Sequence, residues 1–562
     1  MKTINNRVDF RNKLISLSIA MVCGLSLLLT SCTGVTSTPV QEPGIEQATS
    51  QPTATIPIIT ATLTVVQAQN IIERPLIADE SVKFSKEQCP ASIDEYTQLI
   101  KDNPGSAEAY YNRGCAYFNL GDYKNAIADY NQAIEISPHF AWAYNNRGLA
   151  HFVNGDHLKA ITDFGRAIQI DAQYSQAYNN RGLAHYRSDD NELAIADFNK
   201  AIQLDENNAG ACYNLGYVYY AMREYDKAIT AFEQTTQIDP QFASAFAQLG
   251  MVYSGQGDQE TAIDNFDQAI EINPQKSEFY YNRGLVYHRS GDYIKAITDY
   301  DQALQIDPGY ASAYFNRGWL YEQTGDPDSA LDDYSQAIKN NPQYAEAYVN
   351  RSNIYLNQGE FDKSIADSNQ AIEINPQIAM AYLNRGFALY NKGEVENAIA
   401  DYNQALEIDP QFVMAYNNRG LAYATQGDYP KALADYDRAL QIEPQFAYAY
   451  LNRGLVFLAQ GDYASATVEF DQAISLNDQL AMAFRSRAMA YAMSGDNEQA
   501  LADYDRAIQL EPQFAGSYIN RALIYGNAGE YEKARADLET ALRLGLPPEL
   551  EAMVRDLLAQ LP

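Results

Sequence analysis

The sequence predicts an all-α protein, a solenoid of stacked helix pairs. One residue pattern recurs every 34 residues from Ala107 to Pro548, thirteen times without insertion or deletion. Each copy has two stretches with apolar residues at helical spacing, at positions 1–14 and 18–31 counted from its first residue. Tyrosine is frequent, with 43 Tyr against 2 Trp, as expected when one aromatic position recurs many times. A lone helix pair cannot bury its apolar faces, so the copies are expected to stack.

The first element, residues 1–31, has the features of a signal peptide. A basic start precedes the apolar run LISLSIAMVCGLSLLL, which is short for a membrane span. The run leads into Leu29-Thr30-Ser31-Cys32, which resembles the lipobox of bacterial lipoproteins. This resemblance implies cleavage before Cys32 and attachment of acyl chains such as palmitate to that cysteine. The alternative is an uncleaved N-terminal anchor, and in both cases the body is exported and held at a membrane.

The second element, residues 32–88, is dominated by Thr, Pro, Gln and Ser. This composition cannot bury enough apolar surface to order itself. We therefore expect a lipid-anchored flexible tether.

The remaining elements are the repeats and their two ends. Residues 89–106 predict a half-repeat with a single capping helix, and residues 107–548 contain the thirteen repeats. Residues 549–562 carry an apolar stripe at helical spacing, which predicts a second capping helix. Solenoids need such caps because each end repeat leaves one face open.

Small and helix-ending residues recur at fixed positions within each repeat. Glycine at position 15 suits the left-handed residue that ends a helix, and Asp at position 16 suits the N-cap of the next. Position 8 is Gly in ten repeats and position 20 is Ala in all but one, so the two helices can approach closely. Proline at position 32 ends the second helix.

The repeat as a whole resembles the tetratricopeptide repeat in its length and in its aromatic, small and proline positions, as in Ala313–Tyr321 with Gly325, Ala330 and Pro342. The resemblance implies antiparallel helix pairs stacked into a right-handed superhelix. Its concave groove is lined by positions 2, 5, 6, 9, 12 and 13.

An arginine and a carboxylate vary together within the repeat. Position 7 is Arg in eleven repeats and Leu at Leu215 and Leu249. Position 23 is acidic in all except those same two repeats, where Ala231 and Asn265 stand. This covariation predicts ion pairs within each repeat, such as Arg113–Asp129 and Arg317–Asp333, with a structural role. Position 4, an aromatic residue in twelve repeats, is expected to fill the core.

Asparagine recurs at position 6 although it is a mediocre helix former. The arrangement resembles the asparagine ladder of O-linked N-acetylglucosamine transferases, whose amides grip the backbone of an extended peptide. This resemblance implies peptide contact, whereas the alternative is that each asparagine caps a neighbouring turn or merely accompanies the arginine at position 7. The asparagine ladder consists of Asn112, Asn146, Asn180, Asn214, Asn282, Asn316, Asn350, Asn384, Asn418, Asn452 and Asn520.

Aromatic side chains at other groove positions form two clusters. They add to the predicted peptide-binding groove, because exposed apolar strips on an acidic protein mark binding surfaces. The clusters consist of Phe118, Phe152, Tyr186 and Tyr220 and of Tyr281, Phe315 and Trp319.

Composition excludes several classes of function. The net charge of −32 disfavours nucleic acid and favours basic or neutral protein partners. The chain has no HExxH, GxSxG or phosphate-loop motif, and His151 and His185 stand where Tyr is usual, as core substitutes. No catalysis, metal or cofactor is therefore expected. Cys89 and Cys115 could form a disulfide after export, but buried free thiols are the simpler expectation.

Two functional hypotheses remain. The first is a membrane-anchored scaffold or adaptor that binds extended peptide segments of partner proteins in its groove. The second is a structural cell-envelope component that self-associates through the solenoid. In both cases we expect the protein on the extracytoplasmic side of a bacterial cell envelope. The outer membrane is preferred because the residue after the lipobox cysteine is Thr33, whereas an Asp there holds many such lipoproteins at the inner membrane.

Overall fold

The computed structural model describes residues 89–562, which contain 28 helices and no strand. This part of the chain forms two compact units, and the division falls inside helix α16. Of the described residues, 89–320 make up the N-terminal unit and 321–562 make up the C-terminal unit. The predicted signal peptide, Cys32 and the tether lie outside the described residues.

The N-terminal unit contains α3 (Cys89–Asp102), α4 (Ala107–Asn119), α5 (Tyr123–Ile136), α6 (Ala141–Val153), α7 (His157–Ile170), α8 (Ser175–Arg187), α9 (Asn191–Leu204), α10 (Ala209–Ala221), α11 (Tyr225–Ile238), α12 (Ala243–Gln256), α13 (Gln259–Ile272), α14 (Ser277–Arg289), α15 (Tyr293–Ile306) and the first part of α16 (Ala311–Gln323).

The C-terminal unit continues with α17 (Pro327–Asn340), α18 (Ala345–Asn357), α19 (Phe361–Ile374), α20 (Ala379–Asn391), α21 (Val395–Ile408), α22 (Val413–Thr425), α23 (Tyr429–Ile442), α24 (Ala447–Ala459), α25 (Tyr463–Leu476), α26 (Ala481–Ser494), α27 (Asn497–Leu510), α28 (Ala515–Ala528), α29 (Tyr531–Arg543) and α30 (Pro548–Gln560).

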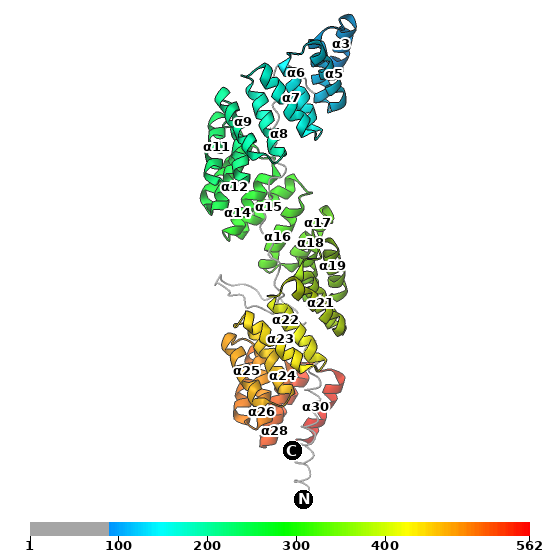
Figure 1. Ribbon diagram of the computed structural model, residues 1–562. Coiled ribbons are helices and arrows are strands. Elements are labelled where there is room, and N and C mark those ends of the chain that lie inside the picture. Colours follow the sequence, from blue (N-terminus) through cyan, green and yellow to red (C-terminus); the bar gives the residue numbers. More distant parts are fainter. Residues whose placement is uncertain (1–88) are drawn as a thin grey trace. The chain divides into compact units, whose positions relative to one another are not determined.

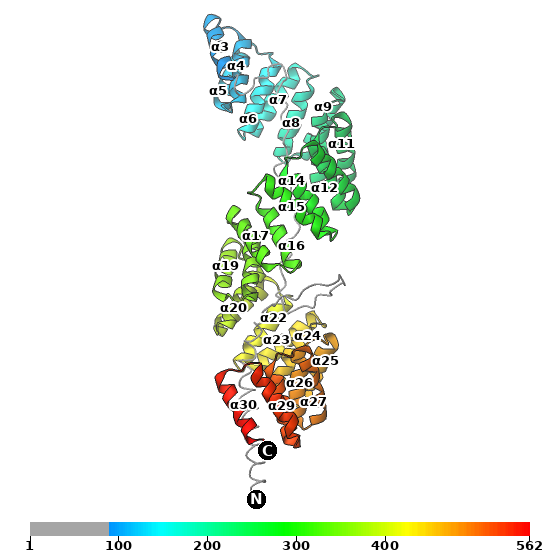
Figure 2. The same ribbon diagram turned by 180° about the vertical axis from the view of Figure 1, so that it is seen from behind.

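Within each unit, helices that follow one another in sequence pack side by side as repeating pairs (Figures 1 and 2). The predicted all-α solenoid is therefore confirmed. The first helix of a repeat covers positions 1–13 in most copies. The second covers positions 17–30 in most copies and begins one residue earlier than predicted, directly after its N-cap at position 16. In α5, for example, the Asp122 side chain accepts a hydrogen bond from the Asn125 N–H at 3.1 Å.

The residue at position 15 is left-handed in every repeat, as the glycine pattern predicts. Eleven repeats have Gly there, with φ between 74° and 94°. Asp189 and Arg223 fill the other two, with φ of 61° and 62°. The turn geometry is thus kept even where the preferred residue is missing, at a cost of about 1 kcal/mol each.

Position 8 lies against the ring at position 24 of the same repeat. A Cβ added to Gly284 would lie 2.8 Å from Cε1 of Tyr300, and the other position 8 glycines meet their rings at similar distances. The ring is fully buried, with Tyr300 0% exposed. The residue that fills the core is therefore the one at position 24, whereas most side chains at position 4 are only half buried.

Both ends of the described chain are covered by a helix. Helix α3 packs on α4, and Thr97 accepts a hydrogen bond from Arg113 at 3.0 Å. At the other end α30 follows α29 (Figure 2), and its residues Val554 and Leu557 are buried against Ile519 and Leu538. None of the helices in residues 89–562 is long and apolar enough to cross a membrane.

Candidate functional site

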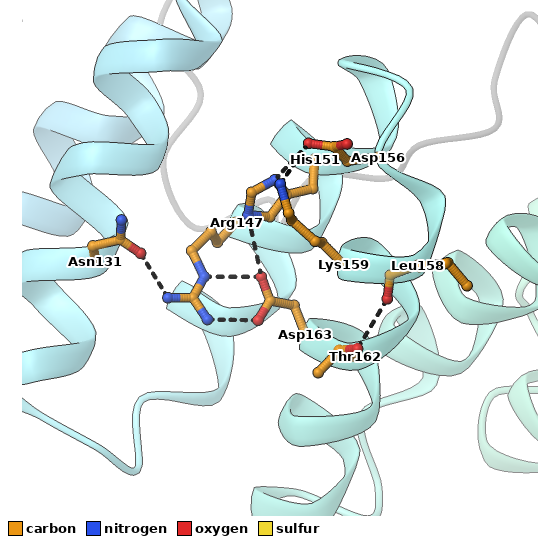
Figure 3. A network of polar contacts seen from close by, with 8 residues as sticks. All are labelled: Asn131, Arg147, His151, Asp156, Leu158, Lys159, Thr162 and Asp163. Carbon is orange, nitrogen blue, oxygen red and sulfur yellow. Dashed lines mark hydrogen bonds and ion pairs between the residues drawn. The ribbon is translucent and has the colours of Figure 1, made fainter.

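Each arginine at position 7 holds the carboxylate at position 23 with two parallel hydrogen bonds. In the second repeat, Arg147 donates from Nε and Nη2 to the two oxygens of Asp163 at 2.8 and 2.6 Å (Figure 3). The carboxylates are largely buried, with Asp163 at 5% exposure. The predicted pairing within the repeat is confirmed. The pairs given by the structure are Arg113–Asp129, Arg147–Asp163, Arg181–Asp197, Arg283–Asp299, Arg351–Asp367, Arg385–Asp401, Arg419–Asp435, Arg453–Glu469, Arg487–Asp503 and Arg521–Asp537.

The same arginine also reaches the preceding repeat, which sequence reasoning missed. Arg147 donates from Nη1 to Asn131 on α5 at 2.6 Å, as Figure 3 shows. Nine other position 7 arginines make the equivalent bond to position 25 of the helix before them. A signal was present, because position 25 is polar in every repeat except at Gly165. Ten of the eleven arginines therefore link a helix pair to its predecessor.

The aromatic residue at position 4 covers this arginine. The guanidinium of Arg147 lies over the ring of Tyr144, with 5.3 Å to the centroid. The ring of Tyr144 also packs against the core, so the interpretation of position 4 as a core filler is correct only in part, because the same half-buried ring stacks on a cation. The hydrogen bond to Asp129 raises the pKa of Arg113 above its ordinary value, so the cation persists at any physiological pH.

The two histidines at position 11 are partly buried beside the carboxylates. Nε2 of His151 lies 4.0 Å from Asp163, and Nε2 of His185 lies 3.9 Å from Asp197. Burial lowers the pKa of both histidines, so they are neutral near pH 7. Among residues 89–562, no group of three or more His, Cys, Asp or Glu side chains is placed to hold a metal ion. Cys115 and Cys212 are buried free thiols.

The asparagine ladder lies between repeats. Nine of its eleven members are buried, with exposures of 0–9%, whereas Asn112 and Asn520 are partly exposed. Six donate from Nδ2 to the residue at position 5 of the preceding repeat. These bonds join Asn146 to Tyr111 (2.9 Å), Asn180 to Asn145 (3.0 Å), Asn214 to Asn179 (3.0 Å), Asn316 to Tyr281 (2.8 Å), Asn384 to Val349 (3.2 Å) and Asn452 to Asn417 (2.9 Å).

Two further asparagines of the ladder also make hydrogen bonds within the chain. Asn350 donates to the hydroxyl of Tyr334 at 3.3 Å, and Asn418 accepts from Asn417 at 3.2 Å. Because these amides make hydrogen bonds within the chain, they have a structural task that needs no ligand. Peptide contact by the asparagine ladder stays a prediction.

The predicted aromatic groove residues divide into two groups. Phe118, Phe152, Tyr186 and Tyr220 are partly exposed and lie on successive first helices. Trp142, on α6, is 44% exposed.

The second aromatic cluster is mostly core. Tyr281 and Phe315 are each 1% exposed, which removes them from any groove surface in this conformation. Trp319 is partly exposed and stacks on His288, with 4.6 Å between ring centroids. Whether a side chain faces the groove or the neighbouring repeat depends on repeat stacking, which the sequence pattern of one repeat does not encode.

A cavity of about 310 Å³, partly open to solvent, lies where the fourth, fifth and sixth repeats meet. It is lined by Tyr213, Gln241, Phe242, Ala243, Ser244, Ile272, Asn273 and Phe279.

The repeats around this cavity depart from the usual pattern. In neighbouring repeats a ring at position 5 packs on a ring at position 34, as Tyr213 does on Phe242 with 5.0 Å between centroids. The fifth repeat has Ala247 and Lys276 at these positions. Phe279 at position 3, where eleven repeats have Ala, is one of the residues that line the cavity. Sequence reasoning missed this site, although the loss of both rings in one repeat was visible.

Comparisons with known proteins agree with this geometry. Models described as tetratricopeptide repeat or TPR repeat match residues 107–140, 141–174, 175–208, 209–242, 255–291, 277–343, 315–377, 388–427, 413–446, 447–480, 488–529 and 515–544, which together make up more than half of the chain. No curated protein matches the chain at a significant level.

Several solved structures are similar. The Cut9–Hcn1 hetero-tetramer of APC/C has a chain with 16% identity and a TM-score of 0.44, covering 84% of this chain and 98% of that one. Yeast Tom70 has 17% identity and a TM-score of 0.35, and the match covers 81% of this chain and 95% of Tom70. YrrB, described as a TPR protein with an unusual peptide-binding site, has 24% identity and a TM-score of 0.29. The match covers 35% of this chain and 99% of YrrB.

Proposed function

The chain belongs to the tetratricopeptide-repeat family, and from this premise we propose that it is a membrane-anchored scaffold that binds extended segments of partner proteins along its first helices. Proteins of this family bind protein partners and peptides. The observation that carries the proposal is the cavity between Phe242 and Phe279. Its volume of about 310 Å³ and the rings of Tyr213, Phe242 and Phe279 among its polar lining residues suit one bulky side chain of a partner.

The half-exposed rings extend this surface within the N-terminal unit. Phe118, Phe152, Tyr186 and Tyr220 offer apolar area on α4, α6, α8 and α10. Side chains of this kind dominate binding energy at protein interfaces. An extended segment would insert one apolar residue into the cavity and lie across these rings.

The test is to fill the cavity. A library of random peptides displayed on phage is selected against the full-length chain in detergent, and the affinities of selected peptides are measured. Ser244→Trp should weaken them about thirtyfold, equivalent to about 2 kcal/mol, because the indole occupies the cavity. Gln176→Trp, at the same repeat position two repeats earlier, is the matched control and should change little. Unaltered affinity in folded Ser244→Trp protein would remove the cavity from the proposal.

The membrane anchor is the second part of the proposal. The basic start, the apolar run and the lipobox-like Leu29-Thr30-Ser31-Cys32 support lipid attachment at Cys32 and export to the cell envelope. Several acyl chains on one cysteine would hold the chain firmly at a bilayer, since a single chain binds only marginally. We expect the wild type to incorporate labelled palmitate and to sediment with membranes, whereas Cys32→Ser should take up none. Labelling that persists in the variant would contradict lipid attachment at this residue.

A further inference from the structure

The hydrogen bond from the position 7 arginine to position 25 of the preceding repeat, the arginine link, is missing at three consecutive junctions. Between the second and third repeats Arg181 is present, but position 25 is Gly165, which has no side-chain acceptor. At the next two junctions the arginine itself is replaced, by Leu215 and Leu249. The ten other junctions from α3 to the thirteenth repeat all have the link. The loss is therefore confined to one continuous part of the described chain, the second to fifth repeats.

Apolar contacts take the place of the link where the arginine is lost. Leu215 is 7% exposed and packs with Leu183 and Phe198 of the third repeat. Leu249 is 4% exposed and packs with Phe232 of the fourth repeat. Apolar attraction has no preferred direction, whereas an arginine with three hydrogen bonds fixes the geometry of its partners. At these junctions the helix pairs can therefore shift against each other without breaking the link that holds the others.

The asparagine ladder compensates at two of the three junctions. Asn180 donates to Asn145 and Asn214 donates to Asn179, each at 3.0 Å. In the fifth repeat the ladder position is Gln248, which is 1% exposed, and neither atom of its amide has a hydrogen-bond partner. A buried amide without partners disfavours the arrangement that buries it. The junction between the fourth and fifth repeats thus lacks both bonds.

Packing is also weakest at this junction. The cavity lies here, lined by Phe242 of the fourth repeat and Ser244 of the fifth. Side chains that face a cavity lose contacts on that side. Glu233, at position 25 of the fourth repeat, is exposed and meets only the hydroxyl of Tyr253 at 3.5 Å. The usual acceptor of an arginine link is therefore present, but the arginine is not.

We propose that residues 141–276 form a flexible segment of the N-terminal unit with its hinge between the fourth and fifth repeats, and that the cavity opens and closes as these repeats move. The flexibility stands on the missing bonds alone, whereas the coupling to the cavity rests on the proposed function. Residues of both repeats line the cavity, so their movement changes its width. A partner side chain in the cavity then stabilises one arrangement of the repeats.

The first experiment measures distances between spin labels in the full-length chain, frozen in detergent so that all coexisting arrangements are recorded. Labels are introduced with an unnatural amino acid in place of Thr162 and Asp264, which are exposed and enclose the three junctions without the link. The matched control pair replaces Ala400 and Ala502, which are exposed, equally far apart in sequence, and enclose three junctions with the link. We expect the distance distribution of the first pair to be about twice as wide.

The second experiment restores the links. Gly165→Asn gives Arg181 an acceptor and should narrow the first distribution, because a Cβ at this position meets only the arginine at 3.8 Å. Gly165→Ala is the control, which adds the Cβ without the acceptor and should leave the width unchanged. Leu249→Arg/Asn265→Asp supplies a new arginine for Glu233 and should narrow the distribution further. Circular dichroism checks that each variant remains folded.

The opposite change tests the same cause in the C-terminal unit. Arg419→Leu/Asp435→Ala removes one link between the labels at positions 400 and 502 and should widen that distribution. Equal widths of the two wild-type distributions would overturn the flexible segment. Widths that do not respond to the restored or removed links would overturn the missing bonds as its cause.

The coupling to the cavity is tested with a peptide selected from the phage library. The peptide should narrow the distribution between positions 162 and 264 in the wild type. It should associate about tenfold more slowly with Leu249→Arg/Asn265→Asp, because the cavity no longer opens freely. If a peptide binds without either effect, the coupling is overturned and both the flexible segment and the proposed function stand. If no peptide is enriched over an unrelated protein, the proposed function and the coupling fall together, and the label distances decide the flexible segment by themselves.

Discussion

At the scale of single residues, position 8 sets how closely the two helices of a repeat approach. At nine of the ten glycines at this position, an aromatic ring at position 24 is shown to lie against the glycine. Where it is Ser352, the partner at position 24 is Ser368, and the two hydroxyls form a hydrogen bond of 3.2 Å. In this repeat the larger residue on one helix is matched by a smaller one on the other.

This matching makes a prediction for Gly284. Gly284→Ala should destabilise the protein by about 1–3 kcal/mol, because the new methyl group would overlap the buried ring of Tyr300. Adding Tyr300→Ser should recover part of the loss. Gly255→Ala is the control, since it lies in a helix with free space around it and should stabilise by about 0.5–1 kcal/mol. The measurement is urea-induced unfolding, and equal effects at the two glycines would contradict the packing argument.

The ion pairs make a second prediction at this scale. Asp367→Ala should cost about 3–5 kcal/mol, because it leaves Arg351 largely buried without its carboxylate. Adding Arg351→Leu should recover much of that loss, as the natural combination of Leu215 with Ala231 indicates. Additive losses in the double variant would show that the pair is not coupled.

A buried carboxyl group gives the third prediction. Glu322 accepts hydrogen bonds from Tyr334 at 3.0 Å and Asn353 at 3.4 Å. Burial nevertheless raises its pKa to about 7, because it penalises the charged form more than these bonds favour it. The folded protein therefore binds this proton more tightly than the unfolded chain does.

The resulting stability is fully present below about pH 4.5 and is lost as the pH rises through about 7. The loss from this group is on the order of 3 kcal/mol. Denaturation of the wild type and of Glu322→Gln between pH 4.5 and 8 should differ in slope, with the variant less sensitive to pH. Parallel curves would contradict a raised pKa at Glu322.

At the scale of helices and repeats, the sequence predicted nearly every element. The residues of a single repeat are enough to predict its left-handed turn, its N-cap at position 16 and the pairing of positions 7 and 23. The burial of the asparagine ladder was harder to predict. The position of an asparagine within one repeat does not show whether the neighbouring repeat covers its side chain. Asn384 is 0% exposed because its neighbour lies over it and provides Ser352 as an acceptor.

The asparagine ladder makes the prediction for this scale. Changing Asn282, Asn316, Asn350 and Asn384 together to Ala should lower the stability by several kcal/mol, since the hydrogen bonds of Asn316, Asn350 and Asn384 each contribute about 0.5–1.5 kcal/mol. Alanine's higher helix propensity would offset only part of this loss. Thermal unfolding measures the change. A quadruple variant that remains as stable as the wild type but loses peptide binding would instead support the predicted contact with peptide backbone.

At the scale of the whole molecule, the stability of such a chain depends on contacts between neighbouring repeats, because each repeat touches little else. Helix α30 covers the last repeat through Val554 and Leu557, which are 0% and 4% exposed. Removing residues 548–562 would expose Ile519 and Leu538 to water. Burial of one such side chain contributes about 1.5–3 kcal/mol, so the last repeat should lose most of its protection from unfolding.

We therefore expect hydrogen exchange to accelerate strongly in α28 and α29 of the truncated chain. The effect should fall off over the preceding repeats, and α3–α15 should exchange as in the wild type, because unfolding in a repeat array spreads only through neighbours. Arg555→Gln in the intact chain is the control: the arginine is exposed and pairs only with Glu551 on its own helix, so exchange should not change. Uniform acceleration throughout residues 89–562 would show that the chain unfolds as one cooperative block, and unchanged exchange in α28 and α29 would show that α30 does not stabilise the end of the array.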